Sequence, residues 1–242
     1  KQSNFKQNST SVIVQKPFFT TIRQQVPNLP FKAVEKPFSE HELLFWKQYG
    51  ISQKELNRYK VKSLASYKSS NKEGQPFNLT SSIQEPIFAY GGNKFVKLYR
   101  PHSKLRFLYG GQMPETYCFG MDQLPQRGDV VFITGGEKDV LSLSAHGFNA
   151  VCFNSETANI SNEIMEMLVR RFRHVIFLYD MDETGKRESA RQCELFSAYK
   201  TMRMELPLPG TKEEKDISDY FRLGNTSDEL KKLISDCLEK IY

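Results

Sequence analysis

The amino-acid sequence predicts an α/β protein, in which a small α+β unit with an antiparallel meander precedes a parallel sheet flanked by helices. Beyond Gly128, apolar segments of strand length alternate with amphipathic segments of helix length, which is typical of a parallel sheet covered by helices. Between residues 86 and 112, short runs of alternating apolar and polar residues are separated by glycine and proline, as in antiparallel hairpins. We therefore expect an extended arm or linker at 1–40, the α+β unit at 41–127 and the parallel sheet at 128–242.

The composition is that of a folded globular protein, with 39% hydrophobic and 26% charged residues in a chain of 242. No apolar run approaches the ~20 residues that span a bilayer, which excludes a membrane-spanning protein. The N-terminal segment has no apolar core of a secretory signal and begins with Lys1, so we expect a piece of a longer protein that is not exported. The four cysteines form no CxxC pair, which disfavours a zinc site and fits reduced thiols in a cytoplasmic protein.

The first two parts contain several recognisable elements. Four prolines among polar side chains favour an extended arm or linker at 1–40. Ser39 and Ser52 are each expected to cap one of two short helices in tandem. Turns at 91–93 and 101–103 divide the meander. Its apolar face is expected to consist of Phe88, Tyr90, Phe95, Leu98, Phe107 and Tyr109.

The third part alternates strand and helix along its whole length. The segment at 174–180 is almost wholly apolar, as expected for a strand that helices cover on both faces. Period-2 and period-3.6 patterns predict the remaining elements. The predicted strands lie at 129–136, 149–154, 174–180 and 201–209, and the predicted helices at 137–147, 161–172, 186–199 and 227–241.

Acidic residues follow the first and the third of these strands. Glu137 and Asp139 come just after the glycines that end the first strand, and Asp180 and Asp182 end the third. Ligands gather beyond the carboxyl ends of parallel strands, so we expect these carboxylates to share one small volume. Carboxylates so close repel one another unless a cation intervenes, and Mg²⁺ prefers such oxygen ligands. The sequence thus predicts a metal site suited to phosphoryl or nucleotidyl transfer. The alternative is that Asp182 only caps the next helix.

A third acidic segment, at 215–220, follows the fourth strand on the same side of the sheet. Asp216 there is either a further carboxylate of the metal site or the N-cap of a short helix. Both interpretations stay open at this point.

The meander carries basic residues and, between 91 and 112, no acidic ones. Such residues bind phosphates with little regard to base sequence, and neighbouring aromatic rings stack on unpaired bases. The alternative is a solvated strand face that lysine keeps soluble. The absence of acids favours nucleic acid, and the residues expected to bind template or triphosphate are Lys97, Arg100, Lys104 and Arg106.

Together these segments resemble the Toprim domain of primases and of the phage and mitochondrial-type helicase–primases. The resemblance is carried by residues 133–139, 180–185 and 215–220, and by the basic stretch at 94–107, and it covers about residues 50–225. It implies a Toprim-like parallel sheet and Mg²⁺ (or Mn²⁺) as cofactor. It also implies partners: single-stranded DNA, nucleoside triphosphates and a helicase domain or subunit. Of the site residues, Asp180 and Asp182 hold the metals, Asp139 and Asp216 assist, and Glu137 is the candidate base.

One position departs from the family pattern. The family's catalytic glutamate normally precedes the glycine at the end of the first strand, where this chain has Gly135. We therefore keep two hypotheses. The first is a primase-like Toprim protein, a DNA-directed nucleotidyltransferase that makes RNA primers in DNA replication. The second is a catalytically silent nucleic-acid-binding module of a helicase, and a Toprim nuclease is a third, weaker option.

Overall fold

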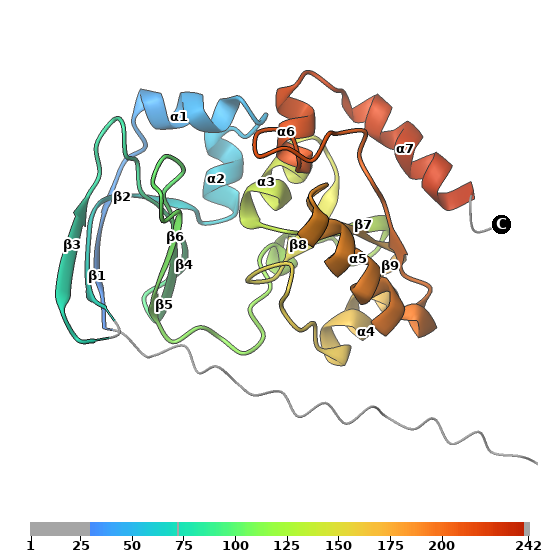
Figure 1. The fold of residues 1–242 in the computed structure, drawn as a ribbon, viewed down its shortest axis with the longest axis horizontal. Coiled ribbons are helices and arrows are strands. Elements are labelled where there is room, and N and C mark those ends of the chain that lie inside the picture. Colours follow the sequence, from blue (N-terminus) through green and yellow to red (C-terminus); the bar gives the residue numbers. More distant parts are fainter. Residues whose placement is uncertain (1–29, 72, 240–242) are drawn as a thin grey trace, which may run out of the picture.

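Two β-sheets lie side by side in the computed structural model, which describes residues 30–239 except 72 (Figure 1). The first sheet is antiparallel and falls within residues 32–111, and the second is parallel and falls within 128–203. Residues 1–29, most of the expected arm, lie outside the described part of the chain. None of the helices described is both long and apolar enough to cross a bilayer.

The antiparallel sheet has the strand order β1-β2-β4-β5-β6, with β3 paired to β2. Its strands are β1 (Lys32–Lys36), β2 (Lys62–Ser70), β3 (Pro76–Thr80), β4 (Phe88–Gly92), β5 (Phe95–Tyr99) and β6 (Phe107–Gly111). Strand β1 pairs with β2, so these five residues belong to the sheet and not to a linker. The other domain boundaries stay predictions. The sequence does not predict β2 and β3, because serine and lysine interrupt the apolar alternation that marks a strand.

Two short helices, α1 (Glu40–Lys47) and α2 (Gln53–Arg58), begin at the predicted caps. The Ser39 side chain accepts a hydrogen bond from the Glu42 backbone N–H, and the Glu42 carboxylate accepts one from the Ser39 N–H. Ser52 caps α2 in the same way, without the reciprocal bond. Trp46 is fully buried, with its ring centroid 4.9 Å from that of Phe88 on β4. The helices thereby cover one face of the antiparallel sheet.

The predicted meander is confirmed as β4, β5 and β6, which pair antiparallel in sequence. The predicted face is wrong for Leu98, which pairs with Ala89 and Leu108 and packs in a separate core cluster. Because side chains alternate along a strand, Lys97 lies on the opposite face and is only 3% exposed. The predicted apolar face is correct for Phe88, Tyr90, Phe95, Phe107 and Tyr109.

The parallel sheet has the strand order β10-β9-β7-β8. Its strands are β7 (Gly128–Thr134), β8 (Asn149–Cys152), β9 (Phe172–Leu178) and β10 (Met202–Arg203). The accompanying helices are α3 (Glu137–Ala145), α4 (Asn162–Arg171), α5 (Glu183–Leu195), α6 (Ile217–Arg222) and α7 (Ser227–Glu239), with single 3₁₀ turns at Met121–Gln123 and Ser197–Tyr199. Strand β10 is shorter than the predicted 201–209, and Pro207 and Pro209 lack the N–H that would continue it to the predicted end.

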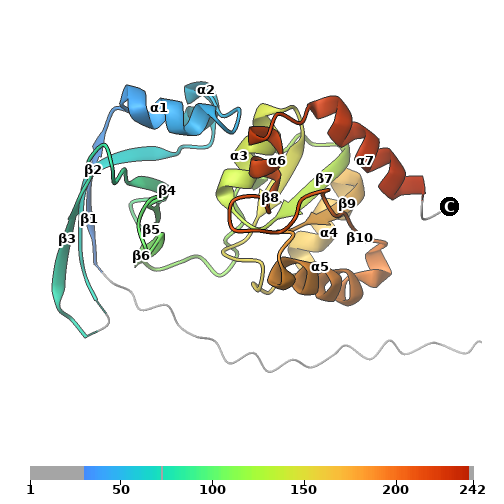
Figure 2. The ribbon, with the colours of Figure 1, turned by 45° about the horizontal axis from the view of Figure 1, so that its top comes forward.

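Helices cover both faces of the parallel sheet, as predicted (Figure 2). One face of the strands, represented by Phe132 and Ile176, packs in the core cluster that holds α3, α6 and α7. The alternate residues, such as Val131 and Val175, pack against α4 and the end of α5. The first of these clusters also contains Trp46 with Phe88 and Tyr90 of β4 and Tyr99 of β5, so the two halves of the molecule share one core.

Candidate functional site

A cleft of about 700 Å³ lies between the carboxyl ends of the parallel strands and the meander. Gly135 follows β7, Glu156 follows β8 and Asp180 follows β9, and all three line it. Aromatic and basic side chains of β5 and β6 line the other side, among them Tyr99 and Phe107. The cleft therefore lies where the strand order of a parallel sheet places a ligand.

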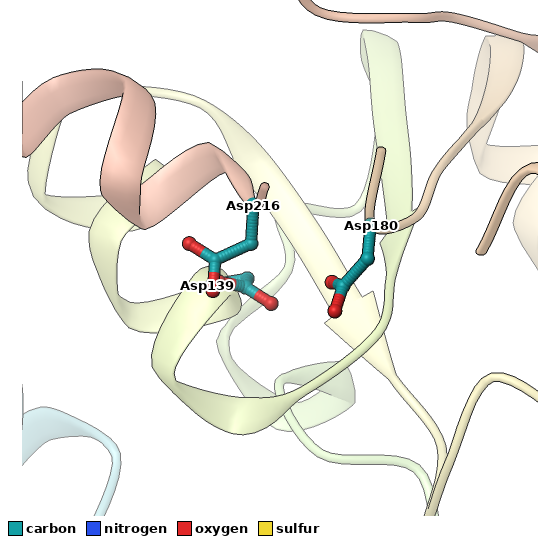
Figure 3. Close-up of side chains that lie close together, drawn as sticks. All are labelled: Asp139, Asp180 and Asp216. Atoms are coloured by element: carbon teal, nitrogen blue, oxygen red, sulfur yellow. The ribbon is translucent and has the colours of Figure 1, made fainter. Parts of the chain in front are cut away.

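Three aspartates converge on the floor of this cleft (Figure 3). Asp139 lies in the first turn of α3, Asp180 follows β9 and Asp216 precedes α6. One carboxylate oxygen of each lies within 4.8 Å of those of the others. The structure thus brings together three of the five acidic residues that the sequence marks as metal ligands, and they come from three separate segments.

Asp216 satisfies both interpretations that the sequence leaves open. Its side chain accepts a hydrogen bond of 2.8 Å from the Asp219 backbone N–H and so caps α6. The same carboxylate lies in the aspartate cluster. Helix capping and membership of the site are compatible because a carboxylate has two oxygens and several lone pairs.

Two lysines form ion pairs with the aspartates at the strand ends. Lys138 Nζ lies 2.9 Å from Asp216 Oδ2 and 3.5 Å from Asp139 Oδ1. Lys215 Nζ lies 2.7 Å from Asp180 Oδ2 and 2.7 Å from Asp182 Oδ2. Burial acts to lower the pKa of Lys138, but Asp216 and Asp139 outweigh it and hold that pKa above its ordinary value. Both ammonium groups therefore stay charged and offset part of the negative charge.

The aspartates differ in their protonation equilibria. Burial, reinforced by the charge of Asp216, raises the pKa of both Asp139 and Asp180. Burial acts in the same direction on Asp216, but Lys138 overrides it and lowers the pKa of Asp216. The two lysines therefore do not fully offset the burial and the charge repulsion at Asp139 and Asp180, and a bound cation would stabilise these carboxylates in their ionised form.

Asp182 lies outside the aspartate cluster. Its Oδ1 accepts a hydrogen bond of 3.0 Å from the Gly185 backbone N–H, so it caps α5. This matches the helix-capping alternative, and it explains why α5 begins three residues before the predicted start at 186. Gly185 is needed here because a Cβ would lie 2.1 Å from the Asp180 carbonyl oxygen.

Glu137 also lies outside the aspartate cluster, although it lines the cleft. Its carboxylate is 1% exposed and pairs with Lys97, whose Nζ lies 2.8 Å from Oε1. The Tyr117 hydroxyl donates a second bond of 2.8 Å to the same carboxylate. The candidate base and one candidate phosphate-binding lysine therefore neutralise each other.

The other predicted basic residues differ in their surroundings. Arg106 is exposed and lines the cleft, and Lys104 is exposed on the loop before β6. Arg100 instead pairs with Glu85 at 2.8 Å and does not line the cleft. The acid-free run at 91–112 is misleading for Arg100, since its acidic partner lies just outside that run.

Glu156 is a site residue that the sequence analysis missed. Its Oε1 accepts a hydrogen bond of 2.8 Å from the Asp180 backbone N–H. Burial, with the charge of Asp180 beside it, raises the pKa of Glu156 to about 7. A usable signal existed, because residues 155 and 156 follow the predicted strand at 149–154 and strand ends are where ligands bind.

The donors of the aspartate cluster fit a divalent cation. All are carboxylate oxygens, the ligands that Mg²⁺ and Mn²⁺ prefer. Ligands on opposite sides of such an ion lie about 4 to 5 Å apart, which is comparable to the 4.8 Å span of the cluster. These residues could therefore hold a single hard metal ion, with room in the cleft for a phosphate group.

Comparison with known proteins gives the same family as the sequence motifs. Residues 132–221 match the Toprim-like family. No curated protein matches the sequence. The primase fragment of the bacteriophage T7 primase–helicase protein is similar in structure, with a TM-score of 0.54 at 17% identity over 78% of this chain and 72% of that one.

Two DnaG structures are also similar. The DnaG catalytic core has a TM-score of 0.61 at 14% identity, over 83% of this chain and 74% of that one. The DnaG primase catalytic domain bound to single-stranded DNA has a TM-score of 0.61 at 14% identity, over 83% of this chain and 75% of that one. Residues 132–221 are therefore similar to the Toprim-like family, and the fold of the chain is similar to that of primase catalytic cores.

Proposed function

We propose that this chain is a primase-like Toprim protein that binds single-stranded DNA and a magnesium nucleotide in the cleft and synthesises RNA primers. The single observation that carries the proposal is the convergence of Asp139, Asp180 and Asp216 at the base of a cleft with basic walls. Nucleotidyl transfer needs this combination, because the metal neutralises phosphate charge while basic side chains hold the remaining phosphates.

In this proposal Asp139, Asp180 and Asp216 would hold Mg²⁺. The ion would neutralise triphosphate charge and lower the pKa of the attacking hydroxyl. Lys212, Lys215 and Arg222 also line the cleft. Their positive charges suit the triphosphate oxygens that the metal leaves uncovered.

The DNA strand is proposed to lie along β6 and the loop before it. Arg106 lines the cleft, and Phe107 beside it is 36% exposed. Exposed basic and aromatic side chains together bind single strands through phosphate contacts and base stacking. The likeness to a DnaG domain bound to single-stranded DNA supports this assignment, and the likeness to part of a primase–helicase supports a helicase domain or subunit as partner. Cytoplasmic replication is the setting that this function implies.

A second function is favoured by the state of Glu137. Its carboxylate is occupied by Lys97 and Tyr117, and Gly135 has no side chain to offer. A chain without a free carboxylate for the attacking hydroxyl could still bind DNA for a helicase. This alternative is a catalytically silent nucleic-acid-binding module.

Template-directed ribonucleotide polymerisation separates the two functions. The assay compares the wild-type chain with Asp139→Asn and Asp180→Asn, with Mg²⁺ or Mn²⁺ present. Asp228→Asn is a matched control, because Asp228 is 88% exposed on α7, where it pairs with Lys231. We expect primer synthesis by wild type and control, and none by the two site variants.

Equal synthesis by all four proteins would exclude the metal centre. No synthesis by any of them, with salt-dependent binding of single-stranded DNA retained, would establish the silent module. A labelled template reports cleavage in the same reactions, and metal-dependent cleavage without nucleotide would indicate a nuclease.

A further inference from the structure

The carboxylate of Glu156 stands in the space that Gly135 leaves open at the end of β7. A Cβ added to Gly135 would lie 2.8 Å from Glu156 Oε1 and 3.1 Å from its Cγ. It would also lie 3.3 Å from Asp180 Oδ1. Any other residue at position 135 must therefore displace Glu156, so the glycine and the glutamate fit each other.

The Glu156 side chain is also fixed from the far side. It starts in the loop after β8 and receives the Asp180 N–H after β9, while β7 lies between these two strands in the sheet. The side chain thus reaches over the end of β7 and arrives beside the aspartate cluster. One partly buried hydrogen bond of 2.8 Å sets its direction.

The charge of Glu156 has no direct partner. Lys138 and Lys215 form ion pairs with the aspartates, and no basic residue of the described chain forms one with Glu156. Its carboxylate instead faces the negative charges of Asp180 and Asp182. Repulsion between carboxylates this close disfavours their ionised forms, and a divalent cation bound by them relieves it.

We propose that Glu156 is a fourth carboxylate of the metal centre, delivered from β8 into the space above Gly135, where it binds the divalent cation together with Asp180. This inference rests on the proposed function, since it requires the metal centre at Asp139, Asp180 and Asp216. It adds a ligand that comes from a different strand than any of the three aspartates.

Binding of Mn²⁺ alone, measured as loss of the free-ion signal in electron paramagnetic resonance, tests the inference without any catalytic assay. Glu156→Gln keeps the shape and the carbonyl oxygen that accepts the Asp180 N–H, but removes the charge. We expect it to weaken Mn²⁺ binding at least tenfold. Glu166→Gln is the matched control, since Glu166 is 47% exposed on α4, and it should bind like wild type.

Gly135→Ala tests the shared space. The added methyl group should displace the Glu156 carboxylate and weaken Mn²⁺ binding with no change in charge. The double variant Gly135→Ala/Glu156→Gln should be no weaker than Glu156→Gln alone, because both changes remove the same ligand. Thermal melts of each variant show that the fold is retained.

The outcomes separate this inference from the function on which it rests. If Glu156→Gln binds Mn²⁺ like wild type while Asp180→Asn does not, Glu156 only ties strand ends together and the inference is wrong. If neither Asp139→Asn nor Asp180→Asn weakens binding, the proposed metal centre is wrong as well.

Discussion

At the scale of single residues, the ion pair between Lys97 and Glu137 joins the two halves of the molecule. Lys97 comes from β5 of the antiparallel sheet and Glu137 from the start of α3, and their side chains are 3% and 1% exposed. Lys97 also donates to the Asn154 carbonyl at 3.0 Å, and the Tyr117 hydroxyl donates to Glu137. Because the pair is buried and satisfied, removal of one member leaves the other charged in an apolar setting.

We predict that Lys97→Met lowers the free energy of unfolding by about 3–5 kcal/mol, because Glu137 keeps its burial and loses its counter-charge. Glu137→Gln should lower the free energy of unfolding less, since the amide oxygen still accepts hydrogen bonds from Tyr117 and Lys97. The double variant Lys97→Met/Glu137→Gln should be more stable than Lys97→Met alone. Urea unfolding of the four proteins measures this cycle, and additive losses would contradict the pairing.

A second residue-scale prediction concerns Glu156 and pH in the absence of metal. Its pKa is raised from 4.5 to about 7 in the folded protein, so the folded state binds the proton more tightly than the unfolded state. The stabilisation is fully present below about pH 4.5 and is lost as the pH rises through 7. The wild type should lose up to about 3 kcal/mol over this range through this group.

The difference in unfolding free energy between wild type and Glu156→Gln, measured in EDTA from pH 5 to 8, isolates this contribution. Glutamine does not titrate, so the free energy of unfolding of the variant should rise relative to that of the wild type as the pH rises. A pH-independent difference would show that Glu156 titrates normally.

At the scale of secondary-structure elements, α6 carries a cap and a site residue in one side chain. Asparagine caps helices as well as aspartate, but it is a poor ligand for Mg²⁺. We predict that Asp216→Asn and Asp216→Ala weaken Mn²⁺ binding equally, while Asp216→Ala is less stable by about 1 kcal/mol. Metal titration and urea unfolding on the two variants check this, and equal stabilities would argue against a capping role.

The hairpin of β5 and β6 divides its basic residues between two environments. Arg106 lines the cleft and should contact a phosphate of bound DNA, whereas Arg100 pairs with Glu85. We predict that Arg106→Ala weakens binding of single-stranded DNA and lowers the slope of log K against log[salt] by about 1. Arg100→Gln should leave that slope unchanged. Fluorescence anisotropy at several salt concentrations gives both slopes. A lower slope for Arg100→Gln with an unchanged slope for Arg106→Ala would show that the DNA does not bind in the cleft.

The same elements show what the sequence could predict. Apolar strands bounded by glycine and helices with serine or aspartate caps were located because their signals are local. Strands β2 and β3 were missed because their stability comes from pairing across the sheet, which local patterns do not record. Within the site, the strand-end rule predicted where acids meet but not which way each side chain turns. Only contacts distant in sequence direct Glu137 to Lys97 and Glu156 to Asp180.

At the scale of the whole molecule, one core cluster runs from α1 and the meander through α3 to α6 and α7. The cleft lies over this shared core, so its basic wall and its acidic floor come from different halves of the chain. Such a cleft keeps its shape only while both halves stay packed together. The fold could be predicted from the order of the segments. The core that the two halves share could not, because it depends on how the two sheets pack against each other.

The central claim is that carboxylates from separate segments share one divalent cation at the end of the parallel sheet. Anomalous diffraction from a crystal soaked in Mn²⁺ tests it most directly. We expect a peak bounded by Asp139, Asp180 and Asp216, with Glu156 as a fourth oxygen ligand. A structure at full Mn²⁺ exposure with no peak there, and with these carboxylates bound only by Lys138 and Lys215, would contradict it.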